Sequence, residues 1–153
     1  MKFIAVIAKS VGLISCLLLA ACAGAPTQEM SNARQSVQAA YDAGANEFAT
    51  RNLEVAHDYL ARAERELELR YFSMAYHDAI VAKSEAIKAH TVATAVQEAQ
   101  AAVDAMEEGS SRDEAQSLLQ EAMNAAREGR DRQAVRLAQE AQRKAESSAN
   151  SGD

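Results

Sequence analysis

Histidines and cysteines, which commonly bind metals or act in catalysis, are few in this chain, and their spacing suits neither task. The histidines are His57, His77 and His90, and none has a cysteine or a second histidine three or four positions away. If their helices form an antiparallel hairpin, His57 and His77 lie roughly 10 Å apart along the axis, whereas the ligands of a zinc ion all lie about 2 Å from it. We therefore expect surface histidines, no metal site and no cofactor.

Nucleophilic and acid–base catalysis are equally poorly supported. The sequence contains no Gly-x-Ser-x-Gly elbow and no glycine-rich phosphate loop, which are the short motifs that point to hydrolysis or phosphate binding. Carboxylates are numerous, but they fall on the outer faces of predicted helices, whereas paired acid–base chemistry needs a concave and partly dry site. The sequence predicts a protein that is not an enzyme.

One cysteine has a chemical role that its surroundings predict. Residues 1–21 begin with a basic region, continue into nine mostly apolar residues and end with Leu19-Ala20-Ala21, directly before Cys22. Nine apolar residues suit the core of a secretory signal peptide and fall short of the roughly 20 that a membrane span needs. The segment from Leu19 to Cys22 resembles the lipobox of bacterial lipoproteins. The resemblance implies cleavage before Cys22 and acylation of its thiol; the alternative is a plain secretory signal followed by a chance cysteine.

The lipoprotein resemblance also implies a location. Cys16 would leave with the signal peptide, so the mature protein would have no free thiol and no disulfide. Ala23 stands where an aspartate would favour the inner membrane, which implies a periplasm-facing anchor in the outer membrane of a Gram-negative cell. Residues 22–29 would then be the lipidated cysteine and a short tether, so the folded part is expected close to the bilayer.

The composition after residue 21 indicates an all-α protein. Of the 132 residues that would remain, 31 are alanine, tryptophan is absent, and glycine and proline are scarce. Alanine has the highest helix propensity of all residues. The same residues hold 14 basic and 22 acidic side chains, a net charge of −8. This charge argues against a nucleic-acid partner, because phosphate binding needs a basic face.

Apolar periodicity and turn residues divide this part of the chain into five expected helices. The third is expected to be one unbroken helix from about Phe72 to Glu107. We expect residues 30–107 to form a three-helix bundle, 108–146 a second hairpin, and 147–153 a disordered tail. The residues that mark where the first four helices begin are Ser31, Thr50, Phe72 and Ser111, and Gly129 marks where the fourth ends and the fifth follows.

Small residues recur at heptad spacing along the expected third helix, which is typical of a seam where two helices pack closely. Gln100 interrupts the seam. It either fixes the register as a buried polar residue or marks where the seam opens to water, and we favour the second because the helix is near its end. From Ala89 to Val103 the seam must pack on the later helices or on another chain. The seam residues are Ala75, Ala79, Ala82, Ala86, Ala89, Ala93, Val96 and Val103.

The aromatic residues after the signal all lie between positions 41 and 76. Beside the seam, Tyr76, Ile80 and Ile87 form a second apolar row, and we expect the first helix to pack there and bury the row in a core. The alternative is a surface that binds a partner, because tyrosine is enriched at interface hot spots. The partner-binding candidates are Tyr71, Phe72 and Tyr76, of which the first two lie near the turn.

Two stretches of the chain share a pattern of small residues at an offset of 59. Either a hairpin is duplicated, or alanines coincide by chance. The pattern resembles the small-residue skeleton of tetratricopeptide hairpins, whose period is 34 residues, but their aromatics and proline are missing, so the fold is tetratricopeptide-like at best. The offset pairs include Ala56 and Ala115, Leu60 and Leu119, and Ala63 and Ala122.

A further resemblance covers about residues 33–93. The sequence here is similar to an envelope family with no assigned activity, the domain of unknown function 4398. Members of that family are lipoproteins or stand ahead of a peptidoglycan-binding OmpA-like domain, and the family has no catalytic residues to transfer. The residues that carry the resemblance are Ala43-Gly44-Ala45, Glu47-Phe48-Ala49, Leu53, Ala56, Leu60 and Ala63.

These observations favour a membrane-anchored periplasmic lipoprotein that acts as a non-catalytic helical adaptor or scaffold for another envelope protein. Helix-in-groove packing and tethering would supply its mechanism. One alternative is a structural spacer of the envelope that self-associates through the seam. Another is a carrier of small ligands or lipids in the bundle, which would need a sizeable cavity.

Overall fold

The structure is a computed structural model that describes residues 24–150. These residues form six helices and no strands, which confirms the all-α prediction. One helix of 33 residues, about 50 Å long, is the spine of an elongated molecule. The bounds of the helices are α2 (Thr27–Asp42), α3 (Ala45–Phe48), α4 (Thr50–Glu68), α5 (Phe72–Asp104), α6 (Ser110–Arg127) and α7 (Asp131–Asn150).

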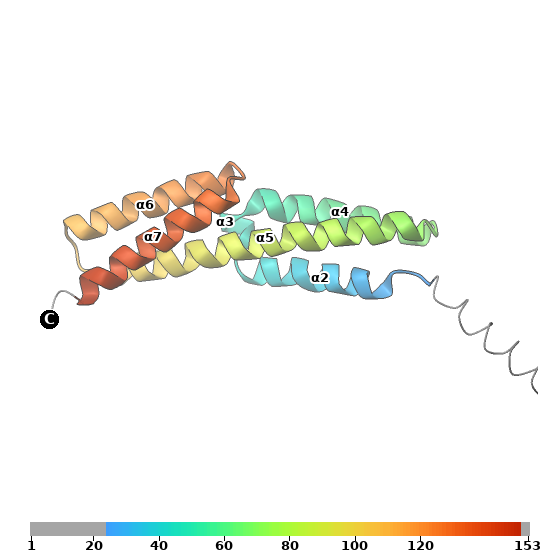
Figure 1. The fold of residues 1–153 in the computed structure, drawn as a ribbon, viewed down its shortest axis with the longest axis horizontal. Helices are drawn as coiled ribbons and strands as arrows, with labels where there is room; N and C mark the ends of the chain where they lie inside the picture. Colours follow the sequence, from blue (N-terminus) through green and yellow to red (C-terminus); the bar gives the residue numbers. More distant parts are fainter. Residues whose placement is uncertain (1–23, 151–153) are drawn as a thin grey trace, which may run out of the picture.

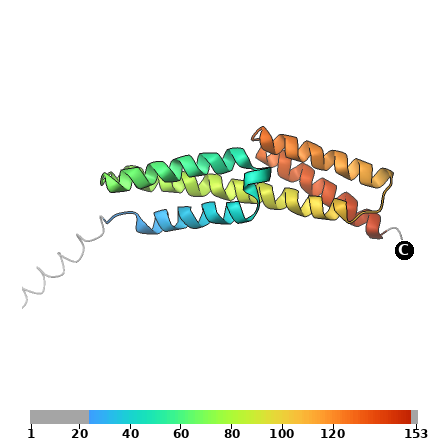
Figure 2. The same cartoon turned by 180° about the vertical axis from the view of Figure 1, so that it is seen from behind.

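The spine α5 is shared by two groups of helices. The helices α2 and α4 pack along its first half, and α6 and α7 pack along its second half (Figure 1). The short helix α3 joins α2 to α4 near the middle of the spine, as the view from behind also shows (Figure 2). The first half is thus a bundle of three long helices, and α6 and α7 form a helical hairpin that packs on the second half.

The first helix begins earlier than the sequence predicted. We expected a start near Ser31 after a tether over residues 22–29, but α2 begins at Thr27, so the end of that tether is helical. Pro26 precedes the helix, where a fixed φ and a missing N–H do no harm. The N–H of Met30 donates to the Pro26 carbonyl at 3.0 Å, and Met30 is fully buried. Packing of Met30 therefore holds the first turn in place.

Two other helix ends differ from the prediction. The spine α5 ends at Asp104 rather than at Glu107. The last helix, α7, continues to Asn150, so the predicted disordered tail over 147–153 is wrong for its first four residues; the rest of that tail lies outside the described residues. The helix continues because no glycine or proline interrupts the chain before Gly152.

The alanine seam of α5 is buried as predicted, and its second half packs within the chain. The helix α7 lies along this half. Near the end of the helix, Ala99 is buried instead of Gln100, which is half-buried and donates its side-chain amide to the carboxylate of Asp104 at 3.0 Å. The position of Gln100 at the edge of the buried stripe favours the interpretation that the seam opens to water there.

The predicted burial of the second apolar row of α5 is wrong. Tyr76, Ile80 and Ile87 are 46%, 43% and 49% exposed. The reason is that α2 offers a single narrow apolar stripe, which packs beside α4 on the alanine seam of α5 and leaves the neighbouring row uncovered. The buried residues of this stripe are Met30, Ala33, Val37 and Ala40.

The turns that join α4 to α5 and α6 to α7 have the same backbone geometry at the predicted offset of 59 residues. Both end the preceding helix in a Schellman motif, with Arg70 (φ 62°) or Gly129 (φ 74°) in the left-handed conformation. This correspondence supports treating α4–α5 and α6–α7 as a repeated unit, here called the first and the second hairpin. The matching N–H to carbonyl pairs are Tyr71 to Glu66 (2.8 Å) and Arg130 to Ala125 (2.8 Å), then Arg70 to Leu67 (3.1 Å) and Gly129 to Ala126 (3.0 Å).

Two polar contacts join the hairpins where α4 begins. The side chain of Arg51 donates from Nη1 to the carbonyl of Glu128 at 3.1 Å. The buried amide of Asn52 donates from Nδ2 to Oδ2 of Asp131 at 2.9 Å. The start of α4 is therefore fixed to the turn between α6 and α7.

Candidate functional site

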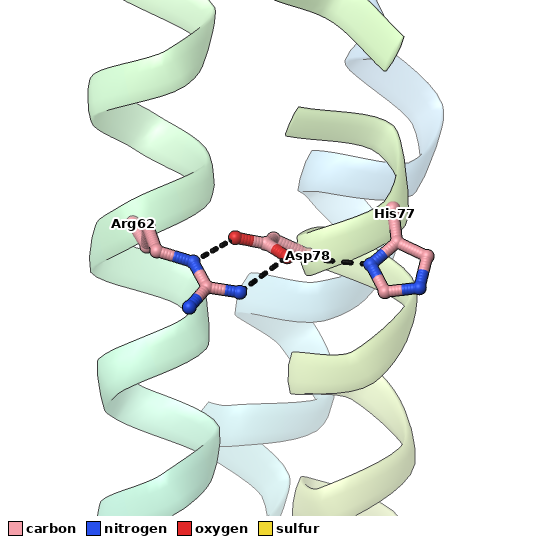
Figure 3. Close-up of polar contacts among 3 residues, drawn as sticks. All are labelled: Arg62, His77 and Asp78. Carbon is pink, nitrogen blue, oxygen red and sulfur yellow. Dashed lines mark hydrogen bonds and ion pairs between the residues drawn. The ribbon is translucent and has the colours of Figure 1, made fainter. Parts of the chain in front are cut away.

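The first hairpin contains a buried carboxylate held by an arginine from the facing helix. Arg62 on α4 donates to Asp78 on α5 through both Nε and Nη2, and the distance from Nη2 to Oδ1 is 2.7 Å (Figure 3). Nδ1 of His77 lies 3.4 Å from the same Oδ1. The guanidinium also lies over the ring of Tyr59, 4.5 Å from its centre. Asp78 is 3% exposed, whereas the side chain of Arg62 is half exposed.

The electrostatics of this cluster do not suit acid–base catalysis. The hydrogen bonds from Arg62 lower the pKa of the Asp78 carboxyl, against the opposing effect of burial. The same hydrogen bonds raise the pKa of the Arg62 guanidinium. Both groups therefore stay charged at neutral pH. A permanently ionised pair that donates and accepts within itself holds two helices together rather than moving protons.

The second hairpin shows that this fold does not need such a pair. The residues at the matching positions, 59 further along the chain, are Leu137 for Asp78 and Glu121 for Arg62. Leu137 is buried and Glu121 is exposed. A leucine thus fills in the second hairpin the place that a buried ion pair occupies in the first.

A second buried acid lies one turn from Arg62 on α4. Glu66 is almost fully buried, and its Oε2 has no hydrogen-bond partner. Its counterpart in the second hairpin is Ala125, which is fully buried. Burial of a polar atom without a hydrogen-bond partner costs free energy, so the side chain of Glu66 lowers the stability of the bundle.

The three histidines lie on the surface of the molecule. His57, His77 and His90 are all exposed. Among residues 24–150 no group of three or more histidine, cysteine, aspartate or glutamate side chains is arranged to hold a metal ion. Within the same part of the chain, no helix combines the length and the apolar character that crossing a membrane requires.

The predicted partner-binding residues divide between two surfaces. Phe72 and Tyr76 lie four residues apart on one face of α5, and that face continues to Ile80 and Ile87. Phe72 is half-buried, and the other three are exposed. Tyr71 precedes α5 and belongs to the turn. We call Tyr76, Ile80 and Ile87 the apolar row.

The turn exposes two more apolar side chains, which the sequence analysis did not single out. Leu69, Tyr71 and Met74 are 63%, 55% and 56% exposed, and we call these three residues the apolar turn. Leu69 and Met74 were missed because apolar periodicity finds buried faces, and an exposed turn has no periodicity. The offset of 59 could have found them, because it pairs this turn with one that carries no large apolar residue at the matching positions.

An open hollow of about 680 Å³ lies at the opposite end of the molecule. The loop between α5 and α6 and the last turns of α7 line it, and its lining includes Met106 together with the carboxylates of Glu107 and Glu108. Its shape and its charged rim do not resemble the enclosed, mostly apolar sites that take up small ligands.

The remaining predicted site residue, Cys22, lies outside the described residues. Comparison with known proteins adds no assignment, since no protein-family model, curated protein or solved structure matched the chain.

Proposed function

We propose that this protein is a lipid-anchored adaptor of the bacterial envelope, which faces the periplasm and binds a helix of another envelope protein through the apolar row. The exposure of that row on an otherwise well-packed spine is the observation that carries the proposal. Large apolar side chains aligned on the free face of a rigid helix are typical of helix-in-groove recognition. The role is non-catalytic and needs no cofactor.

The row has the spacing of a helical docking face. Tyr76 and Ile80 are four residues apart, and Ile87 follows two turns later on the same face. Lys83 lies between them and is half-buried against α2. An apolar helix with an acidic residue at its centre would therefore complement this surface in both shape and charge.

The anchor belongs to the same proposal. The order of a basic region, an apolar run and Leu19-Ala20-Ala21-Cys22 supports cleavage and acylation at Cys22. The acyl chains would hold the adaptor at the membrane, because each buried methylene contributes about 0.8 kcal/mol. Ala23 supports the outer membrane as its location. Anchoring would raise the local concentration of the adaptor near its partner.

The two rival functions have less support. A spacer that self-associates through the seam from Ala89 to Val103 would need that seam free, and α7 covers it. Self-association would then have to use the apolar row instead. A carrier of small ligands would need an enclosed cavity, and the close approach of helices along alanine seams leaves little room for one.

Photo-crosslinking in cells tests the adaptor. A photoreactive residue in place of Ile80 should form a discrete crosslinked band with another envelope protein, identified by mass spectrometry. The matched control is position 139, because Gln139 is the exposed counterpart of Ile80 in the second hairpin. A band from both positions, or from neither, contradicts docking through the row. A band that contains this protein alone favours the spacer.

The anchor has its own test. Cys22→Ser should move the protein from the membrane fraction to the soluble fraction of the periplasm. If the variant sediments with membranes as the unchanged protein does, the lipoprotein assignment is wrong.

A further inference from the structure

The apolar turn differs in chemistry from its counterpart in the second hairpin, although the two backbones match. The residues at the positions of Leu69, Tyr71 and Met74 are glutamate, arginine and glutamine in the second hairpin. The turn geometry therefore does not require apolar side chains. Three large apolar residues that are each more than half exposed need another explanation. The counterparts are Glu128, Arg130 and Gln133.

The apolar turn lies at the end of the bundle where the chain enters from Cys22. The helices α2 and α4 run in opposite directions, and Nε of Arg34 on α2 donates to Oε1 of Glu64 on α4 at 2.9 Å. Seven residues before Arg34 lies the start of α2, and seven residues after Glu64 lies Tyr71. The start of α2 and the apolar turn are thus at the same end (Figures 1 and 2).

The length of chain between the anchor and the fold is short. Pro26 is already buried against the bundle, so four residue steps separate it from Cys22. Four extended residues span at most about 14 Å. An acylated Cys22 would therefore hold this end of the bundle no more than about 14 Å from the lipid surface, about twice the thickness of one headgroup layer.

The second turn is not near the anchor. Its Glu128 carbonyl accepts a hydrogen bond from Arg51 at the start of α4, a full helix of 19 residues away from the apolar turn. That distance is roughly 28 Å. Apolar and charged side chains are thus distributed between two equivalent turns according to their distance from the anchor.

We propose that the apolar turn inserts into the headgroup region of the bilayer, so that the protein rests on the lipid surface through Leu69, Tyr71 and Met74 as well as through its acyl chains. Arg70, which is exposed between Leu69 and Tyr71, would reach lipid phosphates. Tyrosine and arginine beside aliphatic residues suit the boundary between water and hydrocarbon. The inference rests on the proposed acylation of Cys22, and it leaves the apolar row free for a protein partner.

An environment-sensitive label tests the insertion in the absence of any protein partner. The full chain is expressed in a Gram-negative bacterium, purified in detergent and reconstituted into vesicles of phosphatidylethanolamine and phosphatidylglycerol. An acylated Cys22 has no reactive thiol, so one introduced cysteine takes the label. The test position is Met74→Cys, and the control is Gln133→Cys, its half-buried counterpart in the second turn.

We expect the emission of the label at position 74 to shift to the blue on reconstitution, and a quencher carried on the lipid to remove most of that emission. The label at position 133 should show neither the shift nor the quenching. Circular dichroism checks that both labelled proteins keep their helices. If vesicles retain the protein and the label at 74 behaves like the one at 133, the insertion is wrong and the anchor stands. If the protein does not stay with vesicles and Cys22→Ser changes nothing, the anchor itself fails, and the insertion falls with it.

Discussion

Asp78 and Arg62 form a pair whose members differ in burial, so removal of one is not equivalent to removal of the other. Arg62→Met would leave the carboxylate of Asp78 buried without its main partner. The substitution should therefore lower the free energy of unfolding. The double variant Arg62→Met/Asp78→Leu should recover most of that loss, because leucine fills the matching place in the second hairpin. Urea unfolding at neutral pH measures the free energy of unfolding of the single and the double variant. The control is Arg65→Met, at an exposed position on the same helix. Equal losses in the single and double variants would contradict this account.

The same pair predicts a dependence of stability on pH. Because Arg62 lowers the pKa of the Asp78 carboxyl in the folded state, the folded state binds fewer protons at this group than the unfolded state between the two pKa values. Its stabilising contribution is therefore complete above the unfolded value of about 3.9 and is lost as pH falls through the lower folded value. In Asp78→Leu this loss should be absent, so the unfolding midpoint of the variant should fall less than that of the unchanged protein between about pH 5 and about pH 2. A parallel fall in both proteins would exclude Asp78 as the cause.

Glu66 is the residue at which a change should increase stability. Its buried Oε2 has no partner, and methionine has a similar length with no polar atom to satisfy. We expect Glu66→Met to raise the free energy of unfolding by about 1 kcal/mol, as measured by urea unfolding at neutral pH. Glu68→Met, at an exposed position on the same helix, serves as the control. A loss of stability in Glu66→Met would indicate that Oε2 has a polar partner, such as a bound water molecule.

Substitutions in the two turns should change stability in opposite directions. Arg70 and Gly129 occupy the same left-handed position, which strains a residue with a Cβ and favours glycine. Arg70→Gly should therefore raise the free energy of unfolding by about 0.5 kcal/mol, after the entropy that glycine adds to the unfolded chain is subtracted. Gly129→Ala should lower it by about 1 kcal/mol, because its Cβ would also meet Arg51 at 3.1 Å. Thermal unfolding followed by circular dichroism compares the two, and changes of the same sign would contradict equivalence of the turns.

The elements that sequence alone predicted well are those with strong periodicity. The seam from Ala75 to Val103 was predictable because small residues every three or four positions leave a helix one face on which to pack closely. The burial of Ile80 was predicted wrongly, because an apolar row beside a seam has the same periodicity whether or not a third helix covers it. Whether a third helix covers this row is decided by the width of the apolar stripe on α2. That width depends on how the three helices share one core.

The candidate surfaces, too, could be predicted only in part from the sequence. Tyr71 and Tyr76 could be named from residue type, but their assignment to two different surfaces needed the position at which α5 begins. The pair of Arg62 and Asp78 was not predicted, since the residues are 16 positions apart and on different helices. Sequence patterns report on one helix at a time, whereas such pairs depend on the register between helices.

The continuity of α5 couples the two halves of the molecule. The helix carries buried residues along its whole length, so neither half can unfold without removing packing from the other. If Cys22 is the anchor, the end that holds the apolar turn lies at the membrane, and α5 extends up to about 50 Å from it. A rigid spine of that length would present the apolar row near the membrane and the second hairpin farther into the periplasm.

This coupling predicts how the molecule responds when the joint between its halves is weakened. In Asn52→Ala the buried hydrogen bond to Asp131 is lost, and we expect the free energy of unfolding to fall by about 1–2 kcal/mol. Because α5 remains shared, the variant should still melt in one transition, and amide exchange should accelerate in α2 as well as in α7. Thr50→Ala is the control, because Thr50 is exposed and its hydroxyl contacts Asn46 in its own half. Two separate transitions, or faster exchange confined to α7, would show that the halves fold independently and that the spine does not couple them.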